Sequence, residues 1–313
     1  MDSSTEVTPD ALAATPARRA LRAVLGPALP YVLHLRPAEW PIMAGHSALG
    51  WWLASGTLAL DGDAWRGLAA WVICLNGGTL ALNSAFDRDT GDVAYLRHPP
   101  PPPKGLAAAS VALMLAGLAL TWSLPPLYRW LYVACVAMSV AYSVPPLRLK
   151  AVGGADWIIN MLGFGTLSPL AGWAITGRPL EPWATMTLWA FCPLFAALYP
   201  LTQLYQIDED RARGDRTLVI RLGVRRSLAI AVACTGLAFG MLVGAGVAAG
   251  WGLPADALRW TALGIAMLGW IAVLFPWYQG GHGWSSAEHQ RGMYHALAAW
   301  ALTDAAVLLG ALG

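Results

Sequence analysis

Long apolar segments alternate along this chain with short polar or Pro/Gly-rich connections. A helix needs about 20 apolar residues to cross roughly 30 Å of hydrocarbon, so each segment of that length predicts a membrane helix. The segments that satisfy this length are 38–60, 65–86, 105–123, 126–145, 154–176, 182–206, 226–250, 256–277 and 290–311. The pattern therefore predicts an all-α, polytopic membrane protein built as a bundle of nine transmembrane helices.

The composition supports a membrane location. Of the 313 residues, 57% are hydrophobic and 12% are charged, whereas about a quarter of the residues in a soluble domain are charged. The 17 Trp and 33 Gly suit membrane helices, because Trp favours the interface and Gly lets helices approach closely. The four cysteines show no CxxC spacing, which argues against a disulfide framework or a zinc site. We expect membrane lipids around the chain and no nucleic-acid partner.

Basic residues divide unequally between the two sides of the predicted bundle. Of the 20 Lys and Arg residues, 16 share the side of the N-terminus, and only Arg66, Arg129, Arg178 and Arg259 lie opposite. Cytoplasmic loops are enriched in Lys and Arg, so the N-terminus is expected in the cytoplasm, in a bacterial cytoplasmic (inner) membrane. Residues 1–24 lack the apolar core of a signal peptide. They are expected to form a disordered cytosolic tail, which leaves 25–313 as the membrane domain.

The second expected span ends in a polar segment, NSAFDRDTGD. Asn83 and Asp87 are four residues apart, so a continuing helix presents both on one face, and Asp89 and Asp92 follow. Carboxylate and amide oxygens suit Mg²⁺, which completes its coordination shell with water and phosphate oxygens. A solvated helix end made of ordinary turn residues explains the segment equally well at this point.

A second acidic motif, QIDEDRARGDRTL, follows the sixth span, and the charge asymmetry places it on the same cytoplasmic side. Asp208 and Asp210 are followed here by Arg211 and Arg216. Two acidic motifs on one face suit a ligand with several phosphate charges, because a metal ion bridges carboxylate to phosphate and guanidinium groups bind phosphate oxygens. The alternative is a solvated loop held by salt bridges.

The connection after the fourth span, YSVPPLRLKAVGGADWIIN, adds two cations and a buried acid. Arg148 and Lys150 could neutralise charge on a diphosphate leaving group, or could act only as positive-inside anchors. Asp156 and Asn160 are four residues apart at the start of the fifth span. An aspartate within a membrane helix costs about 2.5–3.5 kcal/mol on insertion scales, which makes it a candidate functional residue.

The three segments NSAFDRDTGD, YSVPPLRLK and DEDRARGDRTL stand in the order found in the UbiA superfamily of intramembrane prenyltransferases, which the chain resembles over about residues 34–311. The resemblance implies nine helices with an active-site cap on the cytoplasmic side. It also implies Mg²⁺-dependent transfer of a prenyl group from a prenyl diphosphate donor to a lipophilic, aromatic acceptor. Mg²⁺ and the diphosphate would lie between the two acidic motifs, with the isoprenoid tail among the helices.

The resemblance also implies roles for individual residues. The residues implied as metal ligands are Asn83, Asp87, Asp208 and Asp210. The residues implied to bind the diphosphate are Arg97, Arg148, Lys150, Arg211 and Arg216. Those implied as catalytic are Asp87, Lys150 and Asp210, with Asp89, Asp92, Asp156, Asn160 and Gln206 as additional candidates.

The motifs depart from the family pattern where charge is expected. Ser84 and Gly91 stand where relatives carry Asp, and Gln203 and Gln206 stand upstream of Asp210 in place of further carboxylates. The site therefore holds less negative charge than in relatives, which puts a second metal ion in question. Terpene cyclisation by the same ionisation step is an alternative, as is a transporter whose acidic clusters bind cations. Two acidic motifs on one face favour a single phosphate site over the paired broken helices of a transporter.

Two polar residues in the expected spans have no place in these motifs. Asp304, in the middle of the ninth span, is expected to face the bundle or a partner because of the cost of burying its charge. His46, in the first span, is expected to be a packed, hydrogen-bonded histidine rather than a residue of the acceptor pocket.

Overall fold

The computed structural model describes residues 16–87, 93, 96, 99–212 and 214–312. Every regular element in that part of the chain is helical, with two isolated β-bridges, Val93–Leu96 and Val152–Arg216. In chain order the elements are α2 (Pro16–Leu25), η1 (Gly26–Ala28), α3 (Leu29–His34), η2 (Pro37–Glu39), α4 (Trp40–Ser55), α5 (Gly62–Ala69), η3 (Ala70–Gly77), α6 (Gly78–Asp87), α7 (Leu106–Leu120), α8 (Pro126–Ser143), η4 (Leu149–Ala151), α9 (Ala155–Asn160), η5 (Met161–Leu167), α10 (Ser168–Ala174), α11 (Pro182–Gln203), η6 (Leu204–Gln206), α12 (Ile207–Ala212), α13 (Leu218–Ala248), α14 (Ala257–Gly280), η7 (Gly281–Gly283) and α15 (Ser286–Leu312). The predicted all-α class is confirmed.

Five helical segments among the described residues are long and apolar enough to cross a membrane. They are Gly62–Asp87, Pro182–Ala212, Leu218–Ala248, Ala257–Gly283 and Ser286–Ala311. The expected first span, 38–60, contains α4, whose 16 residues are fewer than the roughly 20 that cross a bilayer unaided. The outer surface carries many exposed apolar side chains, including Trp130, Leu258 and Leu237. This surface suits a lipid environment.

The described part of the N-terminal segment begins with a short helix. Residues 16–25 form α2, and residues 1–15 lie outside the described part of the chain. Arg18, Arg19 and Arg22 alternate with Leu21 and Val24, a spacing that gives a helix one basic and one apolar face.

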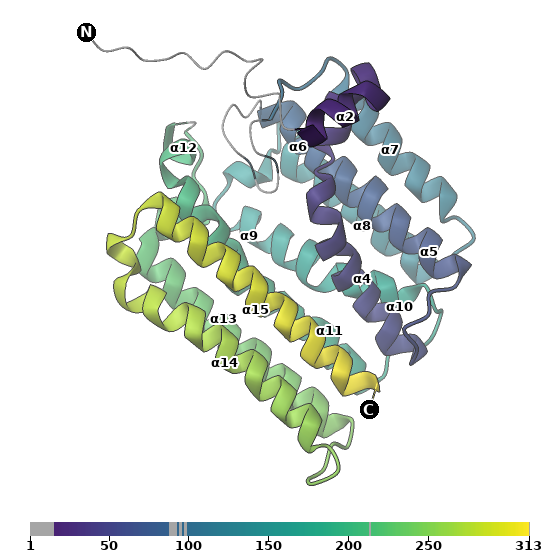
Figure 1. Ribbon diagram of the computed structural model, residues 1–313, viewed down its shortest axis with the longest axis vertical. Coiled ribbons are helices and arrows are strands. Elements are labelled where there is room, and N and C mark those ends of the chain that lie inside the picture. The colour runs from purple at the N-terminus through teal and green to yellow at the C-terminus, as the bar shows by residue number, and fades with distance from the viewer. Residues whose placement is uncertain (1–15, 88–92, 94–95, 97–98, 213, 313) are drawn as a thin grey trace.

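The helices pack in two groups that share α4 and α10 (Figure 1). One core lies among α4, α10, α11, α13, α14 and α15. The other core lies among α4, α5, η3, α7, α8 and α10. Close contact between α4 and α10 depends on glycine, because a Cβ on Gly50 would overlap the carbonyl oxygen of Pro169 and one on Gly172 would overlap that of Ser47.

Two of the expected spans are interrupted by π-helical turns. The second span passes from α5 through η3 to α6, and the fifth passes from α9 through η5 to α10. Such turns are rare in proteins overall, and those that occur often lie at functional sites. Here Asn76 of η3 and Phe164 of η5 both line the large cavity described below.

Candidate active site

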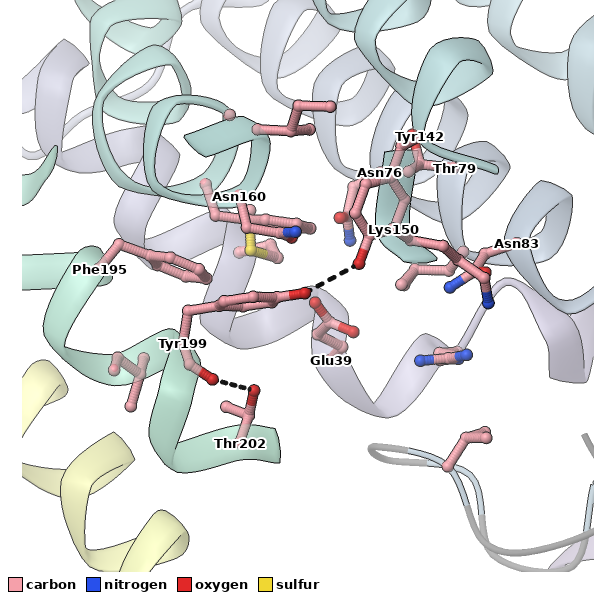
Figure 2. Close-up of a pocket in the computed structure, with 18 of the residues that line it drawn as sticks. Glu39, Asn76, Thr79, Asn83, Tyr142, Lys150, Asn160, Phe195, Tyr199 and Thr202 are labelled. Carbon is pink, nitrogen blue, oxygen red and sulfur yellow. Dashed lines mark hydrogen bonds between the residues drawn. The ribbon is translucent and has the colours of Figure 1, made fainter. Parts of the chain in front are cut away.

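A cavity of about 330 Å³ lies between the two groups of helices, lined by residues of α4, η3, α6, α8, η5, α11 and α15. The volume falls within the range of roughly 300–1,000 Å³ that is usual for small-molecule sites. Its apolar wall includes Met43, Leu75, Phe164, Phe195 and Trp300. Charged and amide side chains gather at the end formed by α6, η4 and α12. The cavity therefore joins a charged mouth to an apolar interior (Figure 2).

The mouth is held together by contacts between the first acidic motif and the basic segment. The ammonium group of Lys150 pairs with the carboxylate of Asp87 and donates a hydrogen bond of 3.3 Å to Asn83 Oδ1. One guanidinium nitrogen of Arg148, Nη2, lies 3.6 Å from Asp87 Oδ1. The other, Nη1, donates a hydrogen bond of 2.9 Å to Asp215 Oδ1. Since Lys150 and Asp87 have side chains only 9% and 5% exposed, these charges interact in a poorly hydrated environment.

The backbone of the basic segment is unusual at Arg148. This residue has φ +36° and lies in the left-handed region, as does Arg36 with φ +51°; they are the two non-glycine residues of the described chain with positive φ. Such conformations are costly for residues with a Cβ and tend to persist at functional sites. Arg36 lines the cavity. Both strained arginines thus lie at or beside the mouth.

The second acidic motif contributes only one face of its helix to the cavity. Asp210, Glu209, Gln206 and Gln203 line it, and Asp210 is buried. Asp208, expected as a metal ligand, has a side chain 96% exposed and lies 3.4 Å from Arg211 Nη1 on the outside of α12. The reason is helical geometry: residues four apart share a face, whereas residues two apart point in nearly opposite directions.

The expected diphosphate-binding arginines of this motif also lie outside the cavity lining. Arg211 and Arg216 are exposed, and Arg216 contributes its backbone N–H to the carbonyl oxygen of Ala151 at 3.3 Å. That contact joins the segment after α12 to the basic segment after α8. Three further candidates, Arg97, Asp89 and Asp92, lie outside the described residues.

Asp156 is fully buried but does not line the cavity. Its carboxylate accepts hydrogen bonds from the backbone N–H of Gly154 at 2.7 Å, from Gln203 Nε2 at 3.0 Å and from the backbone N–H of Leu218 at 3.3 Å. It therefore ties α9 to α11 and α13. Asn160, four residues later, lines the cavity and donates to the carbonyl oxygen of Asp156 at 2.8 Å.

The hydrogen bonds of Asp156 continue through Gln203 to two tyrosine hydroxyl groups on the cavity wall. Gln203 Nε2 also donates to the Tyr199 hydroxyl at 3.2 Å, and the hydroxyls of Tyr199 and Tyr142 lie 3.1 Å apart (Figure 2). Phe195 stacks between Tyr199 and Phe164. The wall beside the mouth is thus aromatic, and aromatic faces stabilise nearby positive charge.

His46 is a packed, hydrogen-bonded histidine, as expected, and it also lines the deep part of the cavity. Its Nδ1 lies 3.0 Å from Asp304 Oδ1, and its Nε2 lies 3.1 Å from the carbonyl oxygen of Gly165. Asp304 therefore faces the bundle. The pair links α4 to α15 below the charged mouth.

Two cavity-lining residues, Glu39 and Asn76, did not emerge from the motifs. Glu39 lies in η2, ahead of α4, and its carboxyl is buried close to Arg36 and to the Asn76 side chain. Asn76 interrupts the apolar run WVICLNGG. Both residues could have been recognised in the sequence as candidate functional residues, because each is a polar side chain within a predicted span and burying such groups is costly.

The mouth carries oxygen donors of the kind that Mg²⁺ binds. Among the described residues, no three His, Cys, Asp or Glu side chains are grouped so that they could hold a metal ion by themselves. Asp87 and Asp210 nevertheless bring carboxylates from α6 and α12, and Asn83 adds an amide oxygen. Because Mg²⁺ usually takes one or two protein carboxylates and fills its shell with water and phosphate oxygens, this set fits an ion bridged by a phosphate ligand.

The fold and site define a class: an all-helical membrane protein whose apolar cavity opens at a mouth of paired acids and bases. The model of the UbiA prenyltransferase family matches residues 39–298, so the chain belongs to that family. It is an integral membrane protein and a prenyltransferase.

Individual relatives agree with this membership. Digeranylgeranylglyceryl phosphate synthase of Natronomonas pharaonis is 32% identical over 205 residues, which cover 63% of this chain and 70% of the relative. The bacteriochlorophyll synthase 33 kDa chain of Cereibacter sphaeroides is 28% identical, with 78% and 83% covered. A UbiA homologue from Archaeoglobus fulgidus, solved bound to DMAPP and Mg²⁺, shares the fold with a TM-score of 0.65 at 17% identity, over 87% of this chain and 98% of that one.

Proposed function

We propose that this protein transfers a prenyl group from a prenyl diphosphate to a lipophilic acceptor inside the membrane, with Mg²⁺ as cofactor. The observation that carries the proposal is the junction of a charged mouth, built by Asn83, Asp87, Lys150 and Asp210, with an apolar cavity of about 330 Å³. A molecule with a diphosphate at one end and a hydrocarbon chain at the other matches both parts. The Archaeoglobus homologue was solved with such a molecule, DMAPP.

The proposed metal ligands are Asn83, Asp87 and Asp210. Bound there, Mg²⁺ would neutralise diphosphate charge and so make the diphosphate a better leaving group. Asp208 is dropped from the set because its side chain points away from the cavity.

Two cations of this chain complete the diphosphate subsite. Lys150 and Arg148, which pair with Asp87 and Asp215 in this structure, would add charge-assisted hydrogen bonds to the departing diphosphate. Arg97, Asp89 and Asp92 remain proposals for the same region. The aromatic wall of Phe195 and Tyr199 would face the allylic cation that forms.

The proposal also includes a topology. We infer nine membrane crossings, with the N-terminus and the charged mouth at the cytoplasmic face of a bacterial inner membrane. The support is the 16 of 20 basic residues on that side of the sequence pattern. Figure 1 places α2 and α12 toward one end of the molecule, as this topology requires.

The proposed function is tested by diphosphate release from purified protein given labelled prenyl diphosphates, Mg²⁺ and acceptors. We expect release to stop on addition of EDTA and to fall strongly in Asp87→Ala and Asp210→Ala. Asp208→Ala is the matched control, since it removes an acid from the same motif but from the outer face of α12. Wild-type protein that releases no diphosphate from any donor would refute the proposal. Release with the prenyl chain recovered as a cyclic hydrocarbon would establish the cyclase alternative instead.

A further inference from the structure

Part of the cavity's polar surface is not used by the proposed diphosphate subsite. Glu39 and Asn76 point into the cavity from η2 and η3, whereas the diphosphate subsite is built from α6, η4 and α12 (Figure 2). Both are at least nine-tenths buried, with exposures of 9% and 5%. They come from two elements far apart in the sequence, so the fold has brought a second polar group of side chains to the same cavity.

Asn76 interacts with the Glu39 carboxyl, but neither its Oδ1 nor its Nδ2 makes a hydrogen bond of regular geometry to any described residue. Buried amides are almost always hydrogen-bonded, and an exception calls for an explanation. A ligand group that reaches this part of the cavity would satisfy the amide.

Glu39 is a buried carboxylate without a close ion-pair partner in the described part of the molecule. Arg36 influences it only through the longer range of its charge. The turn that orients Glu39 is made by Arg36 in its left-handed conformation, closed by a hydrogen bond of 3.0 Å from the Glu39 N–H to the Arg36 carbonyl oxygen. The carboxyl group is therefore held at the cavity wall by a strained turn rather than by a counter-ion.

We propose that Glu39 and Asn76 form the acceptor subsite, that the acceptor presents a hydroxyl group, as an alcohol or a phenol, and that Glu39 takes the proton of that hydroxyl. This inference rests on the proposed prenyl transfer. The hydroxyl hydrogen is donated to the Glu39 carboxylate, and a lone pair of the same oxygen accepts a hydrogen bond from Asn76 Nδ2. A single O–H group thus satisfies both side chains.

The reaction at this subsite balances without a further reagent. The carbon–oxygen bond of the donor breaks, and the diphosphate leaves with the bonding electron pair. The hydroxyl oxygen of the acceptor supplies the electron pair of the new carbon–oxygen bond to the allylic carbon, its O–H bond breaks, and the proton passes to Glu39. Glu39 then releases the proton to water, which restores the carboxylate for the next cycle. A general base must come within hydrogen-bonding reach of the proton that it takes, and Glu39 lines the same cavity as the donor subsite.

The same groups disfavour an acceptor carboxylate. Such an acceptor has no proton to lose, and its charge would be repelled by Glu39 in a poorly hydrated cavity. The remaining charged or titratable side chains that line the cavity are Arg36, His46, Asp87, Cys135, Tyr142, Lys150, Tyr199, Tyr205, Glu209, Asp210 and Asp215. Asp87 and Asp215 are already paired with Lys150 or Arg148, and His46 with Asp304.

The test compares two acceptors of matched size, para-hexylphenol and para-hexylbenzoate, with farnesyl diphosphate as donor. Wild-type protein is expected to prenylate the phenol and not the benzoate. Glu39→Gln, which keeps the shape but cannot take the proton, should lower kcat with the phenol by about 100-fold, within the usual range for a general base. Its donor KM should stay unchanged, which shows that the variant is folded. Glu181→Gln, an exposed acid before α11, is the matched control.

A further readout separates binding of the acceptor from the chemical step. Asn76→Ala should raise the phenol KM about tenfold with little change in the donor KM.

Three results would overturn the inference: faster transfer to the benzoate than to the phenol, donor ionisation without transfer to the phenol, or wild-type kcat in Glu39→Gln. Faster transfer to the benzoate, or wild-type kcat in Glu39→Gln, leaves the proposed prenyl transfer standing, because the prenyl group still reaches an acceptor. Donor ionisation without transfer to the phenol leaves only the ionisation step of the proposed function standing. If the wild-type protein ionises no donor, the proposed function itself fails, and this inference falls with it.

Discussion

At the scale of single residues, two buried aspartates that look alike in the sequence lie in different surroundings in the structure. Asp87 and Asp156 both lie at the ends of expected membrane spans. Asp87 faces the cavity and pairs with Lys150, whereas Asp156 accepts backbone and amide hydrogen bonds inside the bundle. A buried carboxylate needs a counter-ion or hydrogen-bond donors in either case. The kind of partner distinguishes Asp87, a candidate metal ligand, from Asp156, which holds helices together.

The pairing of Lys150 leads to a first prediction. In Lys150→Ala, the donor loses a cation at the mouth, and Asp87 loses its closest partner. Hydrogen bonds to charged groups are worth about 1.5–3 kcal/mol, so we expect the donor KM to rise roughly 10- to 100-fold. Lys104→Ala, at an exposed lysine whose carbonyl rather than ammonium group is used by Tyr31, is the control. An unchanged donor KM in the Lys150 variant would remove this residue from the site.

The hydrogen bonds of Asp156 lead to a second prediction, about stability. Asp156→Ala leaves the N–H groups of Gly154 and Leu218 without their acceptor. Each charge-assisted hydrogen bond is worth about 1.5–3 kcal/mol, so the apparent Tm in detergent should drop clearly. Asp208→Ala should leave it unchanged, because that side chain is exposed. A Tm equal to wild type in the Asp156 variant would contradict its role in holding helices together.

At the scale of elements, the periodicity of the helix determines which residues of the second acidic motif face the cavity. The succession Asp208, Glu209, Asp210 looks like one cluster in the sequence, but a helix turns its members to different faces. The face toward the cavity holds Gln203, Gln206, Glu209 and Asp210. Asp208 therefore adds no charge to the cavity, and Glu209 is the acid that accompanies Asp210 and the two glutamines there.

The contact of α4 with α10 leads to a prediction at this scale. An added methyl group in Gly50→Ala or Gly172→Ala would overlap a carbonyl oxygen of the facing helix. Overpacking typically costs about 1–3 kcal/mol, and a shift of α4 would also displace His46 at the cavity wall. We expect a lower apparent Tm and weaker donor binding.

A matched control for this prediction lies on α13. Gly236 is helical, and a Cβ there would have no neighbour within 4 Å. Gly236→Ala should keep or slightly raise the Tm, because Ala is favoured over Gly in helices by about 1 kcal/mol. Equal Tm values for all three alanine variants would show that the α4–α10 contact is not tight.

At the scale of the whole molecule, the charged mouth lies toward one end of a helical bundle whose sides are apolar. In Figure 1, α12 lies toward one end and the connection from α4 to α5 toward the other. In the proposed orientation, which puts the mouth in the cytoplasm, a charged donor would enter from water while its hydrocarbon chain stays among the helices.

This topology can be tested by cysteine labelling in a variant lacking Cys74, Cys135, Cys192 and Cys234. A cysteine in place of Asp208 should react with a membrane-impermeant maleimide only when the cytoplasmic face is accessible. A cysteine in place of Asp63, whose side chain is 59% exposed, should react from the opposite face. The reverse pattern would invert the proposed orientation.

The sequence by itself determined the all-helical membrane class, the family and the identity of most charged residues of the mouth. These depend on local properties: the length of apolar runs, the spacing of acids along a helix and the order of three motifs. The tertiary structure decided which of those residues meet. Pairing of Lys150 with Asp87 and the outward position of Asp208 depend on how separate helices are rotated against one another.

Only the tertiary structure could show the second polar group of the cavity. Glu39 and Asn76 stand 37 positions apart in the sequence, and each looks there like a single polar residue beside apolar ones. The left-handed turn at Arg36 and the π-helical turn of η3 direct them into one space. Such irregular backbone arises from packing between helices, which no local pattern of hydrophobic and polar positions encodes.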